Sequence, residues 1–356
     1  MNRMFQFSGN WQRKVLIALC VILSVILIVL VSLLAYAKYL MNQINYVDPN
    51  NSVTMSPEQI EEYLKQTDPI DPNYTGPFYD ATDITWGSDV DIQLPEQGDN
   101  IINILLIGQD SRDGVSVQRS DSMILCTINK SAKTITLTSF MRDLYVQIPG
   151  QPDHRLNSSY AWGGMNLLNA TLKKNFGIEV DGNIEVNFYN FAAIVDIMGG
   201  LDVELTANEA SYLNRRGNWD VNPDSAGTWN LTAGVNHLTG EQALAYSRIR
   251  DVGNSDFERT SRQRKVLTLM AEKVKTLNLA QLNSLMTTLL PMVTTDMTQS
   301  QIIGYVAEIF PMISELTIST MRVPEYGDFD NAYISGMSVL LPKLDKINSK
   351  LGDIMK

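Results

Sequence analysis

Two aspartates in the first half of the chain could share a divalent cation. Asp110 follows the apolar run 103–108, and Asp121 precedes the apolar run 123–128. Each aspartate therefore lies at the end of a predicted strand, with a short polar loop between them. Two carboxylates at adjacent strand ends can bind a hard cation such as Mg²⁺, which prefers oxygen ligands and usually bridges to phosphate. Taken alone, the pair favours simple turn chemistry, because aspartate is common where strands end.

A group of basic residues suggests phosphate recognition. Within 18 positions of an acidic chain lie Arg248, Arg250, Arg259, Arg262, Arg264 and Lys265. An extended segment would point Arg248 and Arg250 the same way. On the long helix predicted next, Asp256, Arg259 and Gln263 share one face. Guanidiniums bind phosphate oxygens in a fork and stay charged. The alternative is a solvated helix face with local ion pairs, and the preference for Arg over Lys counts against it.

Arg142 and Asp143 follow the third predicted strand, 134–140. Arg142 is therefore expected at the same end of the sheet as Asp110 and Asp121. A metal pair with several arginines at one sheet edge is suited to a diphosphate. The sequence contains no P-loop and no GxSxG serine motif. With only two histidines, its chemistry must rest mainly on carboxylates, arginines and a metal.

Strands and helices must both contribute to positioning these residues. The predicted strands are 103–108, 123–128, 134–140, 201–205 and 317–323, with a hairpin at 129–131. The predicted helices are 56–66, 163–176, 190–198, 206–214, 240–246, 256–275, 279–290, 298–311 and 337–355. This mixture predicts an α/β or α+β fold with a central sheet.

An uncharged apolar run at 15–37 predicts a membrane anchor. A helix of this length can cross a hydrocarbon core of about 30 Å. Arg3, Arg13 and Lys14 precede the run, and a basic flank normally stays in the cytoplasm. The alternative is a cleaved signal peptide, whose apolar region is usually shorter and leads to a small-residue cleavage site. We therefore predict a single-pass protein of the cell membrane whose C-terminal bulk lies outside the cytoplasm.

Composition and turn signals suggest how the rest is organised. The formal net charge of −11 disfavours nucleic-acid binding. Asp-Pro and Gly-Pro pairs between 38 and 99 are typical of a stalk. The predicted order is a cytoplasmic tail at 1–14, a transmembrane helix at 15–37, a stalk at 38–99, a catalytic domain at 100–325 and a helical extension packed on it at 326–356.

Six stretches in order along the chain carry a family resemblance. They are NILLIGQD at 103–110, RSDSM at 119–123, SFMRD at 139–143, RLN at 155–157, LTGEQALAYSRIR at 238–250 and DFERTSRQR at 256–264. Together they resemble the LytR-CpsA-Psr family of cell-wall polymer ligases, over about residues 100–325. One departure is that Phe140-Met141 replaces the more usual Ile-Pro, which changes the approach of Arg142 without removing it.

The resemblance implies a fold, a reaction and a set of site residues. The fold is an α/β/α sandwich with a mixed central sheet. The reaction transfers a glycan or an anionic polymer such as teichoic acid, with one phosphate, from a polyprenyl diphosphate to peptidoglycan, and the lipid tail lies in an apolar tunnel. Asp110 and Asp121 match aspartates associated with Mg²⁺, with Mn²⁺ as an alternative. The family's diphosphate-contacting positions are matched by Arg119, Arg142, Arg248, Arg250, Arg259 and Gln263.

Two classes of function follow. The first is a Mg²⁺-dependent phosphotransferase in which Arg142, Arg250 and Asp256 are catalytic, with Asp256 as the candidate base. Asp256 matches an acidic position of the family that could orient an arginine or act as the base. The second is a non-catalytic envelope regulator that binds lipid diphosphates, and hydrolysis alone would indicate a polyprenyl-diphosphate pyrophosphatase. The family's older regulatory label is discounted because no DNA-binding module is visible.

Overall fold

The computed structural model of the chain describes residues 32, 35–48, 55–86, 97–109, 120–218, 222–253 and 255–355. It divides into two units, Met1–Ile44 and Asn45–Lys356. In the first unit, residues 35–41 are helical. Within the described ranges, no helix combines the length and apolarity needed to cross a membrane. Almost all of 15–37 lies outside those ranges, so the membrane anchor stays a prediction.

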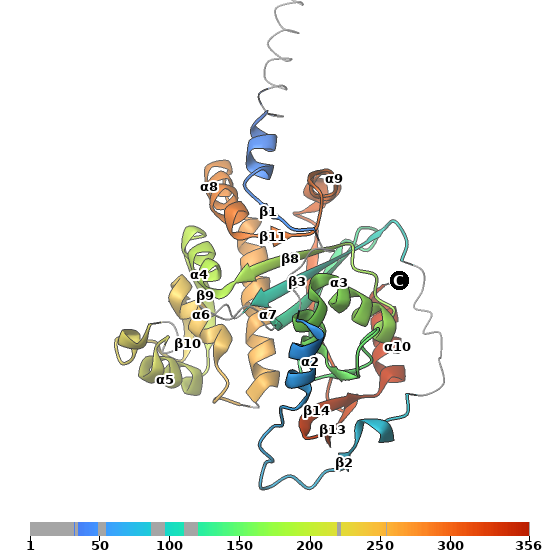
Figure 1. Ribbon diagram of the computed structural model, residues 1–356. Coiled ribbons are helices and arrows are strands. Elements are labelled where there is room, and N and C mark those ends of the chain that lie inside the picture. The colour runs from blue at the N-terminus through green and yellow to red at the C-terminus, as the bar shows by residue number, and fades with distance from the viewer. Residues whose placement is uncertain are drawn as a thin grey trace, which may run out of the picture. The chain divides into compact units, whose positions relative to one another are not determined.

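A seven-stranded mixed sheet forms the centre of the second unit (Figure 1). Its order is β1 (Asn45–Tyr46), β11 (Thr294–Thr295), β8 (Gly182–Asn187), β3 (Ile101–Gln109), β4 (Ser120–Asn129), β5 (Thr134–Phe140) and β12 (Thr317–Val323). β4 runs antiparallel to β3 and β5, while β8 runs parallel to β3 and β12 parallel to β5. The ends of β3, β5, β8 and β12 therefore share one edge with the start of β4, as predicted for β3, β4 and β5.

Helices cover both faces of this sheet because its side chains alternate. On β3, Leu105 and Ile107 join the core formed with α3 (Leu156–Phe176), whereas Ile102 and Ile104 pack towards α9 (Gln299–Ile309). Burial of one such side chain contributes about 1.5–3 kcal/mol. The other helices are α2 (Pro57–Leu64), α4 (Phe188–Ile197), α5 (Ala207–Arg216), α6 (Gly240–Arg248), α7 (Ser255–Val274), α8 (Leu279–Leu289) and α10 (Leu344–Ile354). Short 3₁₀ turns lie at Ala81–Asp83, Pro223–Ser225, Leu290–Met292 and Phe310–Met312.

Three smaller sheets complete the described part of the second unit. β9 (Leu201–Leu205) pairs with β10 (Gly234–Leu238), and β6 (Tyr145–Val146) pairs with β7 (His154–Arg155). The third, called the small sheet below, has the order β14 (Met337–Pro342), β13 (Phe329–Ile334) and β2 (Phe78–Tyr79). The small sheet thus joins segments separated by about 250 residues of sequence.

The structure differs from the stalk predicted at 38–99. The helix expected there is present as α2, and the hydroxyl of Ser56 accepts a hydrogen bond from the backbone N–H of Gln59 as its cap. However, α2 buries Ile60 and Tyr63 in the main core, and β1 and β2 extend two sheets. Proline and glycine turns occur in packed segments as well as in linkers, so the turn pattern could not distinguish the two.

The C-terminal region also differs from the predicted helix at 337–355. Residues 337–342 form β14, and only the part from Leu344 onwards is helical. Along β14, Met337 and Val339 are buried while Ser338 is exposed, the alternation of a half-buried strand. The extension predicted at 326–356 therefore contains a hairpin, β13–β14, before its helix.

Candidate functional site

Asp256, in the first turn of α7, lies among three arginines. Its Oδ2 is 3.3 Å from Nε of Arg142 and 3.4 Å from Nη2 of Arg259. Its Oδ1 is 3.6 Å from Nε of Arg250. Arg142 follows β5, Arg250 follows α6, and Arg259 lies one turn further along α7. Three segments thus bring three guanidiniums to one carboxylate, and we call these four residues the arginine cluster.

The sequence of α6 and α7 explains part of this arrangement. Asp256 and Arg259 are three residues apart on α7, so they share the face predicted from their spacing. Arg248 is the last residue of α6, where a positive charge is favourable at the negative end of the helix dipole. Arg248 and Arg250 therefore do not come from one extended segment, which corrects that part of the prediction. The side chain of Arg250 is 45% exposed and can be reached from solvent.

Gln263 connects α7 to the strand that carries Asp121. The hydroxyl of Ser122 on β4 donates a hydrogen bond to Oε1 of Gln263 at 3.2 Å. In the β3–β4 pairing, Gly108 faces Ser122, but Gln109 faces Ser120. Asp121 is therefore the extra residue of a β-bulge, a feature that re-aims a side chain and often lies beside an active site.

The predicted metal ligands can be tested only through the strand register. Asp110, Arg119 and the side chain of Asp121 lie outside the described residues. Among the residues that the structure does describe, no group of three His, Cys, Asp or Glu could hold a metal. Gln109 pairs with Ser120. Asp110 follows Gln109 in the sequence and Asp121 follows Ser120, so each aspartate is next to a member of this pair. This register is compatible with a shared Mg²⁺ ion, which stays a prediction.

Asp143 is a second carboxylate at the site, and no role was predicted for it from the sequence. Its Oδ2 lies 3.5 Å from Nε of Arg142, and its Oδ1 lies 3.9 Å from Nε of Arg155. Arg155 also contacts Asp68. Burial raises the pKa of Asp143, and Arg142 only partly opposes this. The signal that could have identified Asp143 was its place directly after Arg142 at a strand end.

Two other arginines of α7 belong to the interior and not to the cluster. Arg262 donates through Nε to Oε1 of Glu209 at 2.7 Å. It also donates to the carbonyl oxygens of Ile249 at 3.1 Å and Val252 at 2.8 Å. Arg262 therefore holds the loop that carries the exposed arginine of the cluster. Arg264 is buried, and this burial lowers its pKa to about 10.

Known proteins share this sequence and fold. The sequence pattern of the LytR_cpsA_psr family matches residues 74–352. The polyisoprenyl-teichoic acid–peptidoglycan teichoic acid transferase TagU of Enterococcus faecalis is 36% identical over 182 residues, which are 49% of this chain and 54% of TagU. The transferase TagT of Bacillus subtilis is 28% identical over 262 residues, 72% of this chain and 77% of TagT. This chain thus spans about half the length of that TagU.

A solved structure gives the same fold. It is a LytR-CPS2A-psr family protein, YwtF (TagT), with bound octaprenyl pyrophosphate lipid. It aligns with a TM-score of 0.53 and 26% sequence identity over 73% of this chain and 92% of that one. The match therefore extends over most of the second unit.

Proposed function

The chain belongs to the LytR_cpsA_psr family, and from this membership and the arginine cluster we propose that it is a phosphotransferase. Its reaction moves a teichoic acid or another anionic glycopolymer from a polyprenyl diphosphate to peptidoglycan. The observation that carries the proposal is the gathering of Arg142, Arg250 and Arg259 around Asp256. Guanidiniums are suited to phosphate oxygens because they stay charged and bind in a fork. The names of the related transferases and the lipid bound to TagT supply the substrate class.

The proposed reaction is a displacement at phosphorus. A hydroxyl oxygen of peptidoglycan attacks the phosphorus that is bonded to the polymer. The bond from that phosphorus to the bridging oxygen breaks, and polyprenyl phosphate leaves with the bridging oxygen and its electron pair. The proton of the hydroxyl passes to the released phosphate or to water. The polymer is then joined to peptidoglycan through one phosphate.

The arginine cluster stabilises the charge that builds on the leaving phosphate. Fixed cations at such a position act without reorganising during the reaction. Arg119, Arg248 and Gln263 are proposed as further contacts to the diphosphate. Both oxygens of Asp256 face guanidiniums, so we assign this carboxylate to orienting the arginines rather than to accepting a proton.

A divalent cation and a membrane anchor complete the proposal. Asp110 and Asp121 would hold Mg²⁺ or Mn²⁺, because paired carboxylates at a strand edge suit hard cations. When bound, this ion would neutralise charge on the diphosphate. The apolar run at 15–37 would anchor the chain in the cell membrane with its large unit outside the cytoplasm. This location places the site beside a donor whose lipid tail is embedded in the same membrane.

The proposal can be tested with the full chain reconstituted in nanodiscs. The donor is a saccharide on a short polyprenyl diphosphate, supplied with Mg²⁺ and a peptidoglycan acceptor. Transfer of the phosphorylated saccharide and release of lipid monophosphate are measured together. The wild-type chain should catalyse both, and Arg142→Ala and Arg250→Ala should abolish transfer without unfolding the protein.

Each other outcome has a definite meaning. Near-wild-type transfer by both variants would overturn the assignment of the cluster. Tight donor binding without turnover, even with the acceptor present, would instead make the chain a regulator that senses lipid diphosphates. Lipid monophosphate release that never produces a linked acceptor would indicate a pyrophosphatase.

A further inference from the structure

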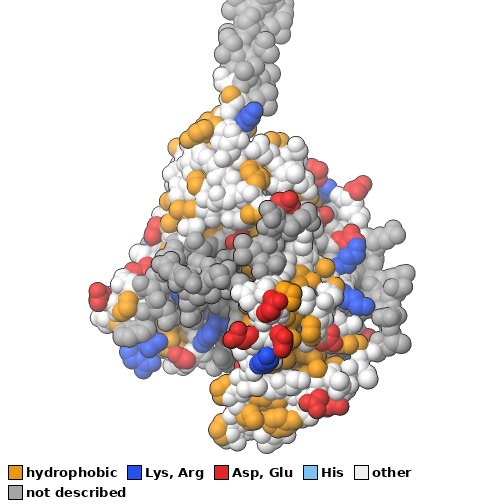
Figure 2. Space-filling view, viewed as in Figure 1, with side chains coloured by type: hydrophobic (Ala, Val, Ile, Leu, Met, Phe, Trp, Pro, Cys, Tyr) orange, Lys and Arg blue, Asp and Glu red, His pale blue; other side chains and the backbone are white. Residues whose placement is uncertain are grey.

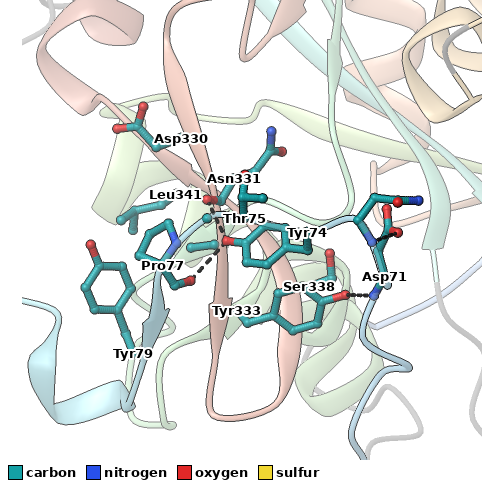
Figure 3. Close-up of a pocket in the computed structure, with 13 residues that line it drawn as sticks. Asp71, Tyr74, Thr75, Pro77, Tyr79, Asp330, Asn331, Tyr333, Ser338 and Leu341 are labelled. Carbon is teal, nitrogen blue, oxygen red and sulfur yellow. Dashed lines mark hydrogen bonds between the residues drawn. The ribbon is translucent and has the colours of Figure 1, made fainter.

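A pocket lies at the small sheet, and none of its lining residues belongs to the arginine cluster. It has a volume of about 740 Å³ and is formed by β2, β13, β14 and the segment 71–77 (Figure 3). Figure 2 shows a patch of hydrophobic side chains at the lower edge of the view, where the small sheet lies. Binding pockets for small ligands are typically about 300–1,000 Å³. The pocket is therefore large enough for a ligand of more than one ring.

Aromatic rings line this pocket, and two of them are held in place. Tyr74 and Tyr333 form an edge-to-face pair with ring centroids 4.7 Å apart. The hydroxyl of Tyr333 donates to the carbonyl oxygen of Pro69 at 3.0 Å, and that of Tyr74 donates to the carbonyl oxygen of Pro77 at 3.0 Å. By contrast, Tyr79 is 36% exposed, and its hydroxyl forms no hydrogen bond with the described residues. The pocket thus combines a fixed aromatic wall with one accessible ring.

Polar groups stand beside these rings. Oδ1 of Asp71 accepts a hydrogen bond from the backbone N–H of Asn73 at 2.9 Å. Asn73 and Asn331 are among the lining residues, and their side-chain amides form no hydrogen bonds with the residues that the structure describes. A sugar ring has an apolar C–H face and an edge of hydroxyl groups. Aromatic faces therefore match a sugar when they stand beside amides, which accept and donate hydrogen bonds, and beside a carboxylate, which accepts them.

The charge of the pocket restricts which sugar polymer fits. Its charged lining residues, among those that the structure describes, are Asp71 and Asp330. Nζ of Lys343 lies 2.8 Å from Oδ1 of Asp330 and offsets that charge, so the net negative charge of the lining comes from Asp71. An anionic polymer would be repelled by the carboxylate of Asp71, whereas an uncharged glycan would not. The arginine cluster has the opposite character and suits the diphosphate donor. The two places are therefore complementary to different substrates of one transfer reaction.

The small sheet is fastened to the strand end that carries the cluster. The backbone N–H of Leu340 on β14 donates to the carbonyl oxygen of Asp143 at 2.9 Å. The N–H of Ser338, which lines the pocket, donates to Oδ2 of Asp68 at 2.8 Å. Asp68 in turn contacts Arg155, which faces Asp143. Hydrogen bonds and ion pairs thus connect the pocket to Asp143, the residue that follows Arg142.

We propose that this pocket binds an uncharged stretch of the acceptor's glycan strand and so positions peptidoglycan for attack at the arginine cluster. The identity of the acceptor rests on the proposed function. A glycan strand is a long polymer, so one molecule can occupy the pocket and still present a hydroxyl elsewhere. In this arrangement, Tyr79 stacks on a sugar ring while Asn73 and Asn331 bind its hydroxyl or acetamido groups.

Oligosaccharide binding tests the pocket directly. The full chain in nanodiscs of neutral lipid is titrated with a β-1,4-linked N-acetylglucosamine hexamer, and the heat of binding is measured. Tyr79→Ala should weaken binding about tenfold, as truncation of a central aromatic contact typically does. Tyr79→Phe keeps the ring and should stay within about twofold. Phe310→Ala is the matched control, because Phe310 is 60% exposed and does not line the pocket.

A transfer assay separates this inference from the proposed function. Tyr79→Ala should raise KM for the peptidoglycan acceptor while leaving kcat and the KM for the lipid diphosphate donor unchanged. Arg250→Ala should abolish turnover but keep the wild-type affinity for the hexamer. If the active wild-type chain does not bind the hexamer, or if Tyr79→Ala binds it equally well, the pocket assignment is overturned and the transferase proposal stands. If the hexamer binds as expected but the wild-type chain turns over no lipid diphosphate donor, the pocket remains a glycan site and the proposed function fails.

Discussion

Two carboxylates meet arginines beside α7, and they do so in different ways. Glu209 pairs with one guanidinium, that of Arg262, over 2.7 Å. Asp256 lies 3.3–3.6 Å from three guanidiniums. Arg262 is 5% exposed, whereas Arg250 of the cluster is nearly half exposed. The first arrangement is short and enclosed, and the second is looser and open.

This difference separates a structural ion pair from a binding site. Arg262 directs its donors at one carboxylate and two backbone carbonyl oxygens, a set that satisfies a buried guanidinium. Around Asp256, by contrast, three guanidiniums share one carboxylate, and Arg142 also faces a second, that of Asp143. The cluster is therefore suited to an incoming anion. Proximity of an arginine to an acid along the sequence did not distinguish the two cases. The distances do, and so does the exposure of Arg250, although Arg259 is as buried as Arg262.

The largest expected effect is on catalysis by Arg250→Ala. Loss of one fixed cation at a developing charge typically lowers turnover by about 10²–10³-fold. Since the Arg250 side chain is so exposed, the free energy of unfolding should change by no more than about 0.5 kcal/mol. Single-turnover transfer and denaturant unfolding of the same preparation would measure both. Transfer above a tenth of the wild-type rate would mean that Arg250 is a surface charge and that the contrast with Arg262 is mistaken.

The next effect is on stability, in Arg262→Met. Removing one partner of a buried ion pair typically costs about 3–5 kcal/mol, because the other charge stays buried. Chemical denaturation should show this loss. The double variant Arg262→Met, Glu209→Leu should recover much of it, since apolar replacement of both partners is often tolerated. A single variant that keeps wild-type stability but loses transfer would place Arg262 in the binding site after all.

Local patterns predicted the elements that position the cluster. Strands 134–140, 201–205 and 317–323 have the same bounds in the structure, because short apolar runs ended by turn residues define strands well. The place of Arg142 at the sheet edge and the shared helix face of Asp256 and Arg259 followed from the same patterns. These features depend on residues close together in the sequence.

Features that depend on distant residues were not predicted. β2 is two residues long and pairs with β13 about 250 residues later, and no local pattern encodes such a partner. β8, with the sequence GNIEVN, has too little apolar alternation to identify a strand. The meeting of Arg250 with Asp256 requires the loop after α6, which Arg262 fixes through Ile249 and Val252. The glycan pocket proposed here consists largely of such distant pairings.

The smallest expected effect is on the pH dependence of the free energy of unfolding, to which two carboxylates contribute with opposite signs. Burial raises the pKa of Glu209, but hydrogen bonds from Thr206 and Arg262 outweigh it, so this pKa lies below its ordinary value. Glu209 therefore stabilises the fold above its unfolded pKa, and this contribution is lost as the pH falls through its folded pKa. Burial raises the pKa of Asp143. Its contribution is present below its unfolded pKa and is lost as the pH rises through its folded pKa.

Two variants test these opposite pH dependences. As the pH rises from about 3 to 7, the unfolding free energy relative to wild type should decrease for Glu209→Gln and increase for Asp143→Asn, each by less than about 2 kcal/mol. Denaturant midpoints at several pH values, at constant ionic strength, would show the two slopes. Slopes of the same sign would mean that Asp143, like Glu209, is a carboxylate stabilised by its arginines. The structural pair and the binding site would then differ in their distances and in the exposure of Arg250, but not in the direction of the carboxylate pKa shift.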